Sequence, residues 1–256
     1  MKINSYKPTE LLRPFIKTYR IIESQGELVN RVVPSSSFAI AFRFRGYISY
    51  IKDDSKIILP TVTFSGLRKS VRLIHYAPNT SALIVLFNET GASAFFKEPL
   101  HNLFEESIPL SSIFPSLEIL MMEERLAKIE NNNSKIAAIE DFLISKLLRT
   151  KPDILISNAL TKIHASSGTI RISKLADDLN ISQDAFEKRF RKVVGATPKQ
   201  FSSIVKISSI IRHNPPSSFL DQAIEHAYYD QSHFNKDFKL FTGQTPTDFF
   251  KSPSYW

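Results

Sequence analysis

The sequence contains no cysteine among its 256 residues. This absence excludes disulfide bonds, thiolate nucleophiles and zinc sites with cysteine ligands. Glycine is scarce, at seven residues, and neither a GxGxxG nor a GxxxxGK pattern occurs, which excludes the common glycine-rich phosphate loops. The six histidines show no HxH or HExxH spacing. We therefore expect no bound metal and no cofactor.

Long apolar runs are missing as well. The aliphatic runs, such as ALIVLF at 82–87, are far shorter than the ~20 residues that span a membrane. The N-terminal segment MKINSYKPTELLRPF lacks the apolar core of a secretory signal. Both absences predict a soluble, cytoplasmic protein.

Positive charge exceeds negative charge in both parts of the chain. The 33 Lys and Arg residues outnumber the 25 Asp and Glu residues, which gives a net charge of +8. Residues 1–150 and residues 151–256 each carry +4 of it. A basic balance suits nucleic-acid binding, although the positions of the charges have to decide it.

The first part of the chain has the pattern of short strands. Runs rich in β-branched and aromatic residues fill positions 28–87: LVNRVV, FAIAFRF, YISYI, KIIL, VTFSG, VRLIHY and ALIVLF. Their spacing of roughly 8–10 residues predicts a small barrel or sandwich. The acidic pair at 53–54 predicts a hairpin turn.

Helical periodicity begins after Pro109. Residues 117–130 and 134–149 predict two amphipathic helices separated by NNN at 131–133. The segment RTKPD at 149–153 marks the expected domain boundary, which gives domains 1–150 and 151–256 in an α+β protein. From Asp153 onward we expect only helices, at 153–166, 172–179, 183–194, 198–212, 219–227, 231–242 and 246–251.

One segment of the last third occurs twice, displaced by 48 residues. Residues 181–198 read ISQDAFEKRFRKVVGATP, and residues 228–246 read YYDQSHFNKDFKLFTGQTP. The matched positions are Phe186, Phe190, Gly195, Thr197 and Pro198 in the first copy, and Phe234, Phe238, Gly243, Thr245 and Pro246 in the second.

Each copy predicts a capped amphipathic helix. Ser182 and Asp230 stand where an N-cap oxygen accepts hydrogen bonds from the first helical turn. A short helix precedes each copy, so the pattern is that of a helix-turn-helix unit, present twice. The expected apolar stripes are Phe186, Phe190 and Val193 in the first helix, and Phe234, Phe238 and Phe241 in the second.

A linker helix at 198–212 joins the two units. At ~1.5 Å per residue it spans about 22 Å. With the half-widths of the two units, this length approaches the ~34 Å between successive major-groove faces of a duplex. One chain can then reach two adjacent turns on one face of DNA.

At these residues the sequence resembles the AraC/XylS family of bacterial transcription regulators. The resemblance covers about 165–251 and is carried by ISKLADDLNISQDAFEKRFRKVVGATPKQF and AIEHAYYDQSHFNKDFKLFTGQTPTDFF. The chain departs from the family at Ala227, where glycine is usual. A weaker resemblance to a sensor region of some family members is carried by YKPTELLRPFIKTYRII, RVVPSSSFAIAF and NETGASAFFKEPLHNLFEESIPLSSIF.

The resemblance implies that the outward faces of the two recognition helices contact double-stranded DNA. By chemistry, Lys188 and Lys236 reach guanine acceptors or phosphates, and Gln231 suits an adenine edge. Arg191 and Lys239 suit phosphates, which position the protein without specifying sequence. The candidate DNA-binding residues are Asp184, Glu187, Lys188, Arg191, Lys192, Gln231, Ser232, His233, Asn235, Lys236 and Lys239.

The two recognition helices differ in acidic residues. Asp184 and Glu187 lie on the outer face of the first helix, whereas we expect no acid on the outward face of the second. A carboxylate near phosphates weakens binding unless it meets a donor such as cytosine N4. The first unit is therefore expected to discriminate more sharply between sequences.

Other classes of function weigh less. Some DNA-repair methyltransferases carry the same helical domain, but they need a reactive cysteine, and no nucleophile–base pair is visible in the β-rich part. We therefore expect no enzyme. A regulator controlled by a small-molecule effector and a constitutive regulator that only dimerises through residues 1–150 both remain. RNA polymerase is a further candidate partner.

The aromatic residues of the strands serve either as an effector pocket or as core. Core packing is the simpler role. The aromatic residues in question are Phe38, Phe42, Phe44, Tyr47, Tyr50 and Phe64.

The apolar excess of LEILMMEERLAKI predicts a homodimer.

Overall fold

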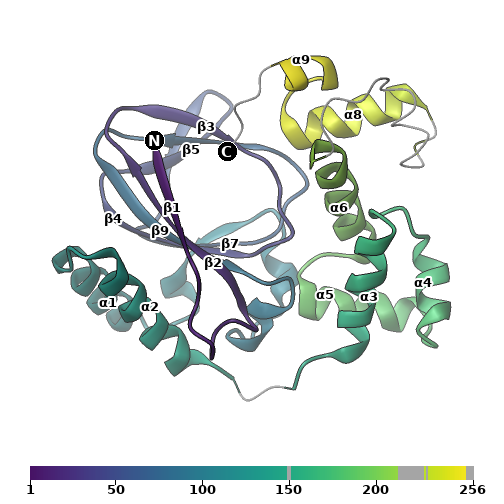
Figure 1. The fold of residues 1–256 in the computed structure, drawn as a ribbon, viewed down its shortest axis with the longest axis horizontal. Helices are drawn as coiled ribbons and strands as arrows, with labels where there is room; N and C mark the ends of the chain where they lie inside the picture. The colour runs from purple at the N-terminus through teal and green to yellow at the C-terminus, as the bar shows by residue number, and fades with distance from the viewer. Residues whose placement is uncertain (149–150, 213–227, 229, 252–256) are drawn as a thin grey trace.

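We describe a computed structural model of the chain over residues 1–148, 151–212, 228 and 230–251. The expected helix at 219–227, and with it Ala227, lies outside these residues. The β-rich part and the described helices that follow Asp153 lie side by side (Figure 1). No helix of the described residues is long and apolar enough to cross a bilayer.

The larger sheet has six antiparallel strands in the order β1-β2-β9-β4-β7-β10. Strand β9 pairs with both β2 and β4, and most of its side chains are buried, which explains the unbroken run ALIVLF. The strands are β1 Lys2–Tyr6, β2 Ile16–Ser24, β9 Thr80–Phe87, β4 Ala39–Arg45, β7 Val62–Ser65 and β10 Ser107–Pro109.

The smaller sheet has four antiparallel strands in the order β3-β8-β5-β6. Asp53 and Asp54 both adopt positive φ angles, 47° and 59°, and form the hairpin turn that the acidic pair predicted. Both sheets keep free edges, so the described strands do not close into a barrel. The strands are β3 Leu28–Val32, β8 Arg72–Tyr76, β5 Ile48–Lys52 and β6 Ser55–Ile58.

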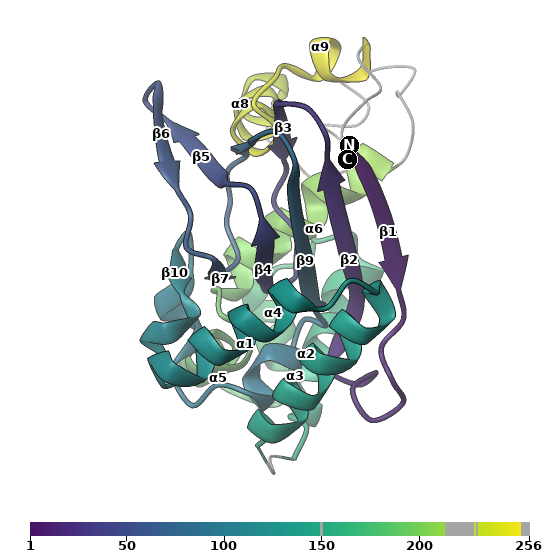
Figure 2. The same cartoon turned by 90° about the vertical axis from the view of Figure 1, so that its left-hand side faces the viewer.

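Two helices follow the strands and cross the lower part of the molecule in front of the larger sheet (Figure 2). They are α1, Ser116–Lys128, and α2, Asn132–Lys146. The side chain of Asn131 accepts hydrogen bonds from two backbone N–H groups of α2, so a break between two helices is confirmed, but it lies at 129–131 and not at the predicted 131–133. Short 3-10 turns precede them at Gly91–Ala94, η1, Leu100–Leu103, η2, and Leu110–Ser112, η3.

The C-terminal helices match the prediction within two residues wherever the structure describes them. Helices α5 and α8 begin after the expected caps Ser182 and Asp230 and end at Gly195 and Gly243, and helices α6 and α9 begin at Pro198 and Pro246. They are α3 Ile154–Ala165, α4 Ile172–Asp178, α5 Gln183–Val194, α6 Pro198–Arg212, α8 Gln231–Thr242 and α9 Pro246–Lys251.

The hydrophobic core runs without interruption from the larger sheet into the helices. Of the aromatic residues in question, Phe38, Phe42 and Phe64 are at most 1% exposed and belong to this core. Phe64 stacks on Phe96 with ring centroids 4.3 Å apart. Tyr47, by contrast, is 60% exposed, so the strand aromatics do not act as one group.

Helices α5 and α8 both end against the β-rich part. Gly195, which follows α5, lies so close to Phe38 that an added Cβ atom would be 2.3 Å from the ring carbon Cζ. The Val71 backbone N–H donates to the Leu240 carbonyl of α8 at 3.2 Å. The two expected domains, 1–150 and 151–256, therefore share a packed boundary, and their independence stays a prediction.

Candidate nucleic-acid interface

Helix α5 is fixed at both ends as its sequence predicts. Ser182 Oγ accepts from the Ala185 N–H at 3.4 Å, and Gly195 ends the helix in the left-handed region at φ +79°. Phe186 and Phe190 are fully buried. The third buried position is Val194 rather than the expected Val193, which is half-buried, because the packed stripe continues one residue further along the helix.

Helix α8 repeats this construction. Asp230 Oδ1 accepts from the His233 N–H at 2.7 Å, and Gly243 ends the helix at φ +78°. Its buried stripe includes Phe234, Phe238 and Phe241, as predicted. Both caps and both glycines thus confirm the sequence match between the two copies.

The turn of the first unit also has the expected conformation. Asn180, between α4 and α5, adopts φ +53°. A short amide side chain tolerates this left-handed conformation better than most. The described residues therefore contain one complete helix-turn-helix unit and the recognition helix of a second.

The candidate DNA-binding side chains lie mainly on the solvent side of α5 and α8. Two of them, Glu187 and Asn235, are only half-exposed. Glu187 Oε1 also accepts from Gln183 Nε2 at 2.9 Å, so its carboxylate has a partner within the helix. The exposed candidates are Asp184, Lys188, Arg191, Lys192, Gln231, Ser232, His233, Lys236 and Lys239.

Two charged residues modify the expected charge pattern. Arg189 of α5 pairs with Asp153, which precedes α3, with Nε 2.6 Å from Oδ2, so its charge is compensated within the described residues. Asp237 of α8 is partly exposed and lies 3.6 Å from His233 Nε2. The expectation that α8 carries no outward acid is therefore wrong, since the wheel position of Asp237 borders both faces.

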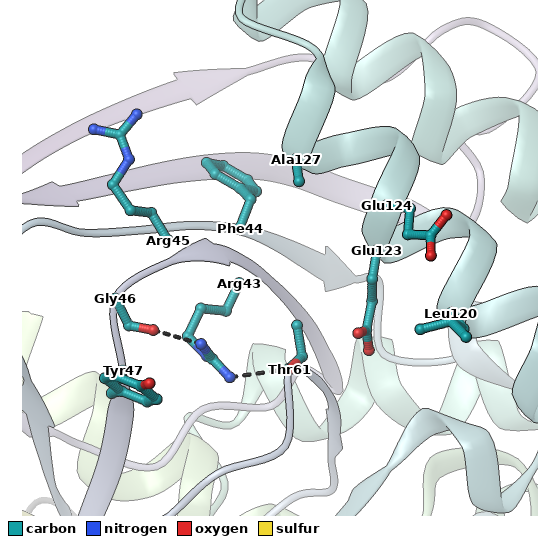
Figure 3. A pocket seen from close by; sticks show the side chains of 10 residues that line it. All are labelled: Arg43, Phe44, Arg45, Gly46, Tyr47, Thr61, Leu120, Glu123, Glu124 and Ala127. Atoms are coloured by element: carbon teal, nitrogen blue, oxygen red, sulfur yellow. Dashed lines mark hydrogen bonds between the residues drawn. The ribbon is translucent and has the colours of Figure 1, made fainter.

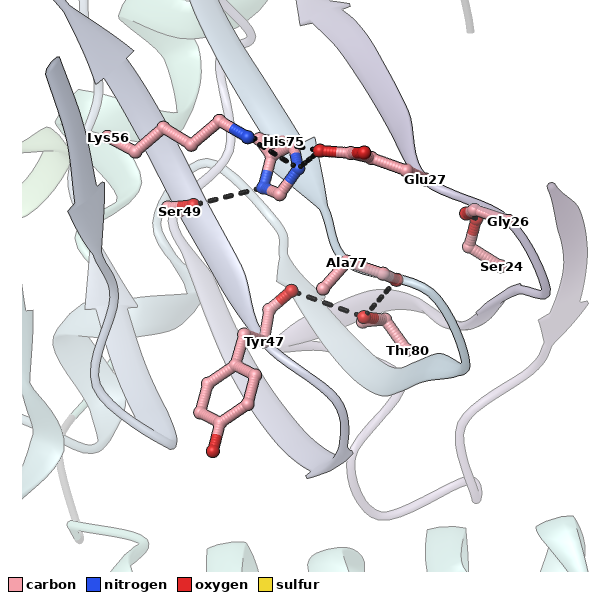
Figure 4. Close-up of polar contacts among 9 residues, drawn as sticks. All are labelled: Ser24, Gly26, Glu27, Tyr47, Ser49, Lys56, His75, Ala77 and Thr80. Atoms are coloured by element: carbon pink, nitrogen blue, oxygen red, sulfur yellow. Dashed lines mark hydrogen bonds and ion pairs between the residues drawn. The ribbon is translucent and has the colours of Figure 1, made fainter.

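A polar cluster that joins three strands of the smaller sheet was missed by sequence; its Ser49 and His75 are buried, whereas Glu27 and Lys56 are exposed (Figure 4). Ser49 Oγ lies 3.2 Å from His75 Nδ1, and His75 Nε2 lies 2.6 Å from Glu27 Oε1. Lys56 Nζ is 3.0 Å from the same carboxylate oxygen. The expectation that the β-rich part holds no nucleophile–base pair is thus wrong, because Ser49 and His75 lie within hydrogen-bonding distance. Ser49, however, is 4% exposed and lines neither of the cavities described below.

This cluster predicts a pH dependence of stability. Hydrogen bonds from His75 and then from Lys56 lower the pKa of Glu27 below its ordinary value of 4.5. A carboxyl group with a lowered folded-state pKa contributes stability above its ordinary pKa and loses it as pH falls through the folded value. We expect Glu27→Gln to lower the melting temperature at pH 7, and this difference from wild type to shrink below pH 4.5. Glu10→Gln, at an exposed residue, is the control, and an equal loss at every pH would contradict this assignment.

A cavity of about 410 Å³ lies between the β4–β5 turn and α1 (Figure 3). On the strand side, Arg43 donates to the Gly46 carbonyl and, at 3.0 Å, to Thr61 Oγ1. On the helix side, burial raises the pKa of Glu123, and the charge of Arg43 partly offsets this. The cavity thus has Arg43 and Arg45 on one wall and Glu123 and Glu124 on the other, and within the described residues Arg43 and Glu123 form no ion pair.

The fold and this arrangement define a helix-turn-helix protein with a β-rich N-terminal part. Residues 175–252 match the family model of a helix-turn-helix domain, and residues 4–109 match a domain of unknown function (DUF6597). The resemblance to AraC-type transcription regulators is thus supported over the helix-turn-helix residues 175–252.

Individual relatives are distant. The Msm operon regulatory protein of Streptococcus mutans is 26% identical over 165 residues, which cover 62% of this chain and 56% of that protein. The chain thus spans little more than half the length of this curated relative. Ligand-free ToxT from Vibrio cholerae shows 10% identity and a TM-score of 0.47, with 97% of this chain and 99% of ToxT covered. ToxT bound to an unsaturated fatty acid shows 11% identity and a TM-score of 0.45, with 91% and 94% covered.

Proposed function

We propose that this chain is a cytoplasmic regulator of transcription that binds specific double-stranded DNA sequences through α5 and α8. The observation that carries the proposal is the duplicated, capped helix whose polar face is exposed while its phenylalanines are buried. Residues 151–256 form the DNA-binding domain in this proposal. RNA polymerase is a further partner that such a regulator would contact.

The test is binding of the full chain to duplexes selected from a random pool. Affinity for the selected duplex should exceed affinity for random duplex at physiological salt. The logarithm of the binding constant should fall with the logarithm of salt concentration, at about 0.9 per neutralised phosphate. Equal binding to selected and random duplexes would contradict the proposal.

Lys236→Ala is expected to weaken binding to the selected duplex by about 1–3 kcal/mol if Lys236 contacts a base, and to reduce the salt slope by about 1 if it contacts a phosphate. Lys236 is exposed on α8, so the substitution should leave the melting temperature almost unchanged. Lys52→Ala, on β5, removes the same charge outside the interface and is the control. Equal affinities for the two variants would exclude Lys236 from the DNA contact.

The N-terminal part is proposed to form a homodimer through α1. Ile119, Met122 and Leu126 bury one face of this helix. Leu117, Leu120 and Met121 are 69%, 51% and 62% exposed on another. Adjacent exposed apolar side chains of this size are typical of interaction surfaces.

Replacing Leu120 and Met121 together by glutamate should convert the dimer into a monomer, because two carboxylates would then face the same apolar surface of the partner. Sedimentation at micromolar concentration measures the change. Lys128→Glu, an exposed position at the end of α1, is the control. A wild-type chain that sediments as a monomer with and without DNA would contradict the dimer.

We further propose control by a small-molecule effector bound in the cavity of Arg43 and Glu123. Phe38, Phe42 and Phe64 fill the interior of the larger sheet, so this surface cavity is the better candidate. A ligand of the folded state raises the melting temperature by mass action. A thermal-shift screen on wild type and Arg43→Ala tests this. If no compound raises the melting temperature of wild type more than that of Arg43→Ala, the filled interior of the larger sheet favours the second candidate, a constitutive dimeric regulator.

A further inference from the structure

A second cleft, of about 400 Å³, opens in the helical region between the α3–α4 turn and the first half of α6. Residues Gly168–Ser173 form one wall. Lys199, Ser202, Ser203 and Lys206 of α6 form the other. We call this the α6 cleft. Its lining contains three basic side chains and no carboxylate.

The walls of the α6 cleft are held together by close backbone packing. Gly168 adopts φ +76°, and an added Cβ atom would lie 2.3 Å from the Ser202 carbonyl oxygen and 2.8 Å from the Lys206 nitrogen. The Gly168 N–H donates to the Ile163 carbonyl at 2.8 Å. The cleft is therefore formed in the folded chain before any ligand enters.

The basic side chains of the cleft lack acidic partners. Arg171 and Lys199 are exposed, and neither forms an ion pair within the part of the chain that the structure describes. Lys206 Nζ lies 4.2 Å from the centroid of the Tyr228 ring instead of against a carboxylate. Burial lowers the pKa of Lys206, and Asp237 opposes this shift. An anion bound in the cleft would stabilise the charged forms of all three side chains.

Ser202 gives an independent indication of a ligand. Its side chain is only 5% exposed, and its Oγ has no hydrogen-bond partner among the described residues. By contrast, the hydroxyls of Thr169 and Ser203 donate to the Ser166 and Lys199 carbonyls. A buried hydroxyl without a partner destabilises a fold. Ser202 lines the cleft, and its Oγ has one donor left, but neighbouring atoms cover Oγ, so a phosphate oxygen must displace some of them to reach it.

We propose that the α6 cleft binds a phosphate group. Phosphate offers several acceptor oxygens to cations and a hydroxyl donor at once, which a two-oxygen carboxylate matches less well. The first helix of a helix-turn-helix unit crosses the DNA backbone. The duplex backbone is therefore the favoured source of the phosphate, and a free phosphorylated compound is the other. The duplex source rests on the proposed DNA binding, whereas the phosphate site does not.

The first experiment uses inorganic phosphate as the probe and the full chain as the protein. Melting temperatures are compared in phosphate and in chloride at equal ionic strength for wild type, Lys199→Met, Ser202→Ala and Lys52→Met. Phosphate also stabilises proteins by exclusion from their surface. Comparison with Lys52→Met corrects for this effect and for the loss of one positive charge, because both apply equally to the two variants. We expect the phosphate-dependent rise to be smaller in Lys199→Met than in Lys52→Met.

Ser202→Ala separates a ligand donor from a structural residue. In chloride it should raise the melting temperature, because the unpaired buried hydroxyl is removed. The rise in melting temperature from chloride to phosphate should be smaller for Ser202→Ala than for wild type. A variant that melts higher in both salts by the same amount would show that the hydroxyl contacts no phosphate.

The second experiment distinguishes the two sources with a random-sequence duplex. If the backbone fills the cleft, the salt slope of Lys199→Met should fall by about 0.9 relative to Lys52→Met. An unchanged slope together with phosphate-dependent stabilisation would assign the cleft to a free phosphate compound. The cleft would also stand if wild type binds no duplex, in which case only the proposed function fails. Equal results for Lys199→Met and Lys52→Met in both experiments would overturn the site.

Discussion

Gly195→Ala should destabilise the folded chain by about 2–5 kcal/mol. The left-handed conformation at φ +79° costs an alanine ~1–2 kcal/mol. The new Cβ atom would also lie 2.3 Å from Phe38 Cζ and 3.2 Å from the Leu100 carbonyl oxygen. Phe38 is fully buried, so its ring has no free space to move into, and such overpacking adds ~1–3 kcal/mol.

The second copy provides a matched control for this substitution. Gly243 has nearly the same conformation, φ +78°, but its added Cβ atom would meet only Val71 Cγ1, at 3.1 Å. Gly243→Ala should therefore cost only the conformational ~1–2 kcal/mol. Urea unfolding of both variants measures the difference. Equal losses would mean that the Phe38 contact does not constrain Gly195.

Phe190→Ala should remove about 3–5 kcal/mol from the free energy of unfolding. Its ring is fully buried and makes edge contacts with Phe186 and Phe201, at centroid distances of 5.6 and 5.7 Å. The loss would leave a cavity beneath α5, so DNA binding should fall together with stability. Denaturant unfolding and duplex titration of the same samples measure both.

Val193→Ala is the control for Phe190→Ala. Val193 is half-buried on the same helix, so its truncation removes little buried surface and should cost about 1 kcal/mol. If the two variants unfolded at the same urea concentration, Phe190 would not be the core residue that the repeat predicts.

The helices of the C-terminal part were predictable because their ends are marked in the sequence. Ser182 and Asp230 cap them, Gly195 and Gly243 end them, and phenylalanines recur at helical spacing between these marks. The first strands were missed. Lys17 and Arg20 interrupt the apolar pattern of β2, and β1 has only one apolar residue among its inner positions. β10 has three residues, too few to show a period.

Contacts between distant segments could not be predicted from local patterns. Arg189 meets Asp153 across 36 residues, and His75 meets Glu27 across 48. Both pairs depend on which helices and strands become neighbours, which periodicity does not specify. The α6 cleft likewise requires the α3–α4 turn to fold onto α6. The candidate DNA-binding residues needed only a helix and its buried face, which is why sequence placed most of them on the exposed side.

The contacts of Gly195 with Phe38 and of Leu240 with Val71 give the β-rich part a thermodynamic connection to both recognition helices. A change in the separation of the helices must break or rearrange at least one of these contacts. If an effector binds more tightly to one arrangement, DNA that favours the other must weaken the effector by the same factor. The operator would thus act on the sensor as strongly as the sensor acts on the operator, and titrating either ligand in the presence of the other would measure a single coupling constant.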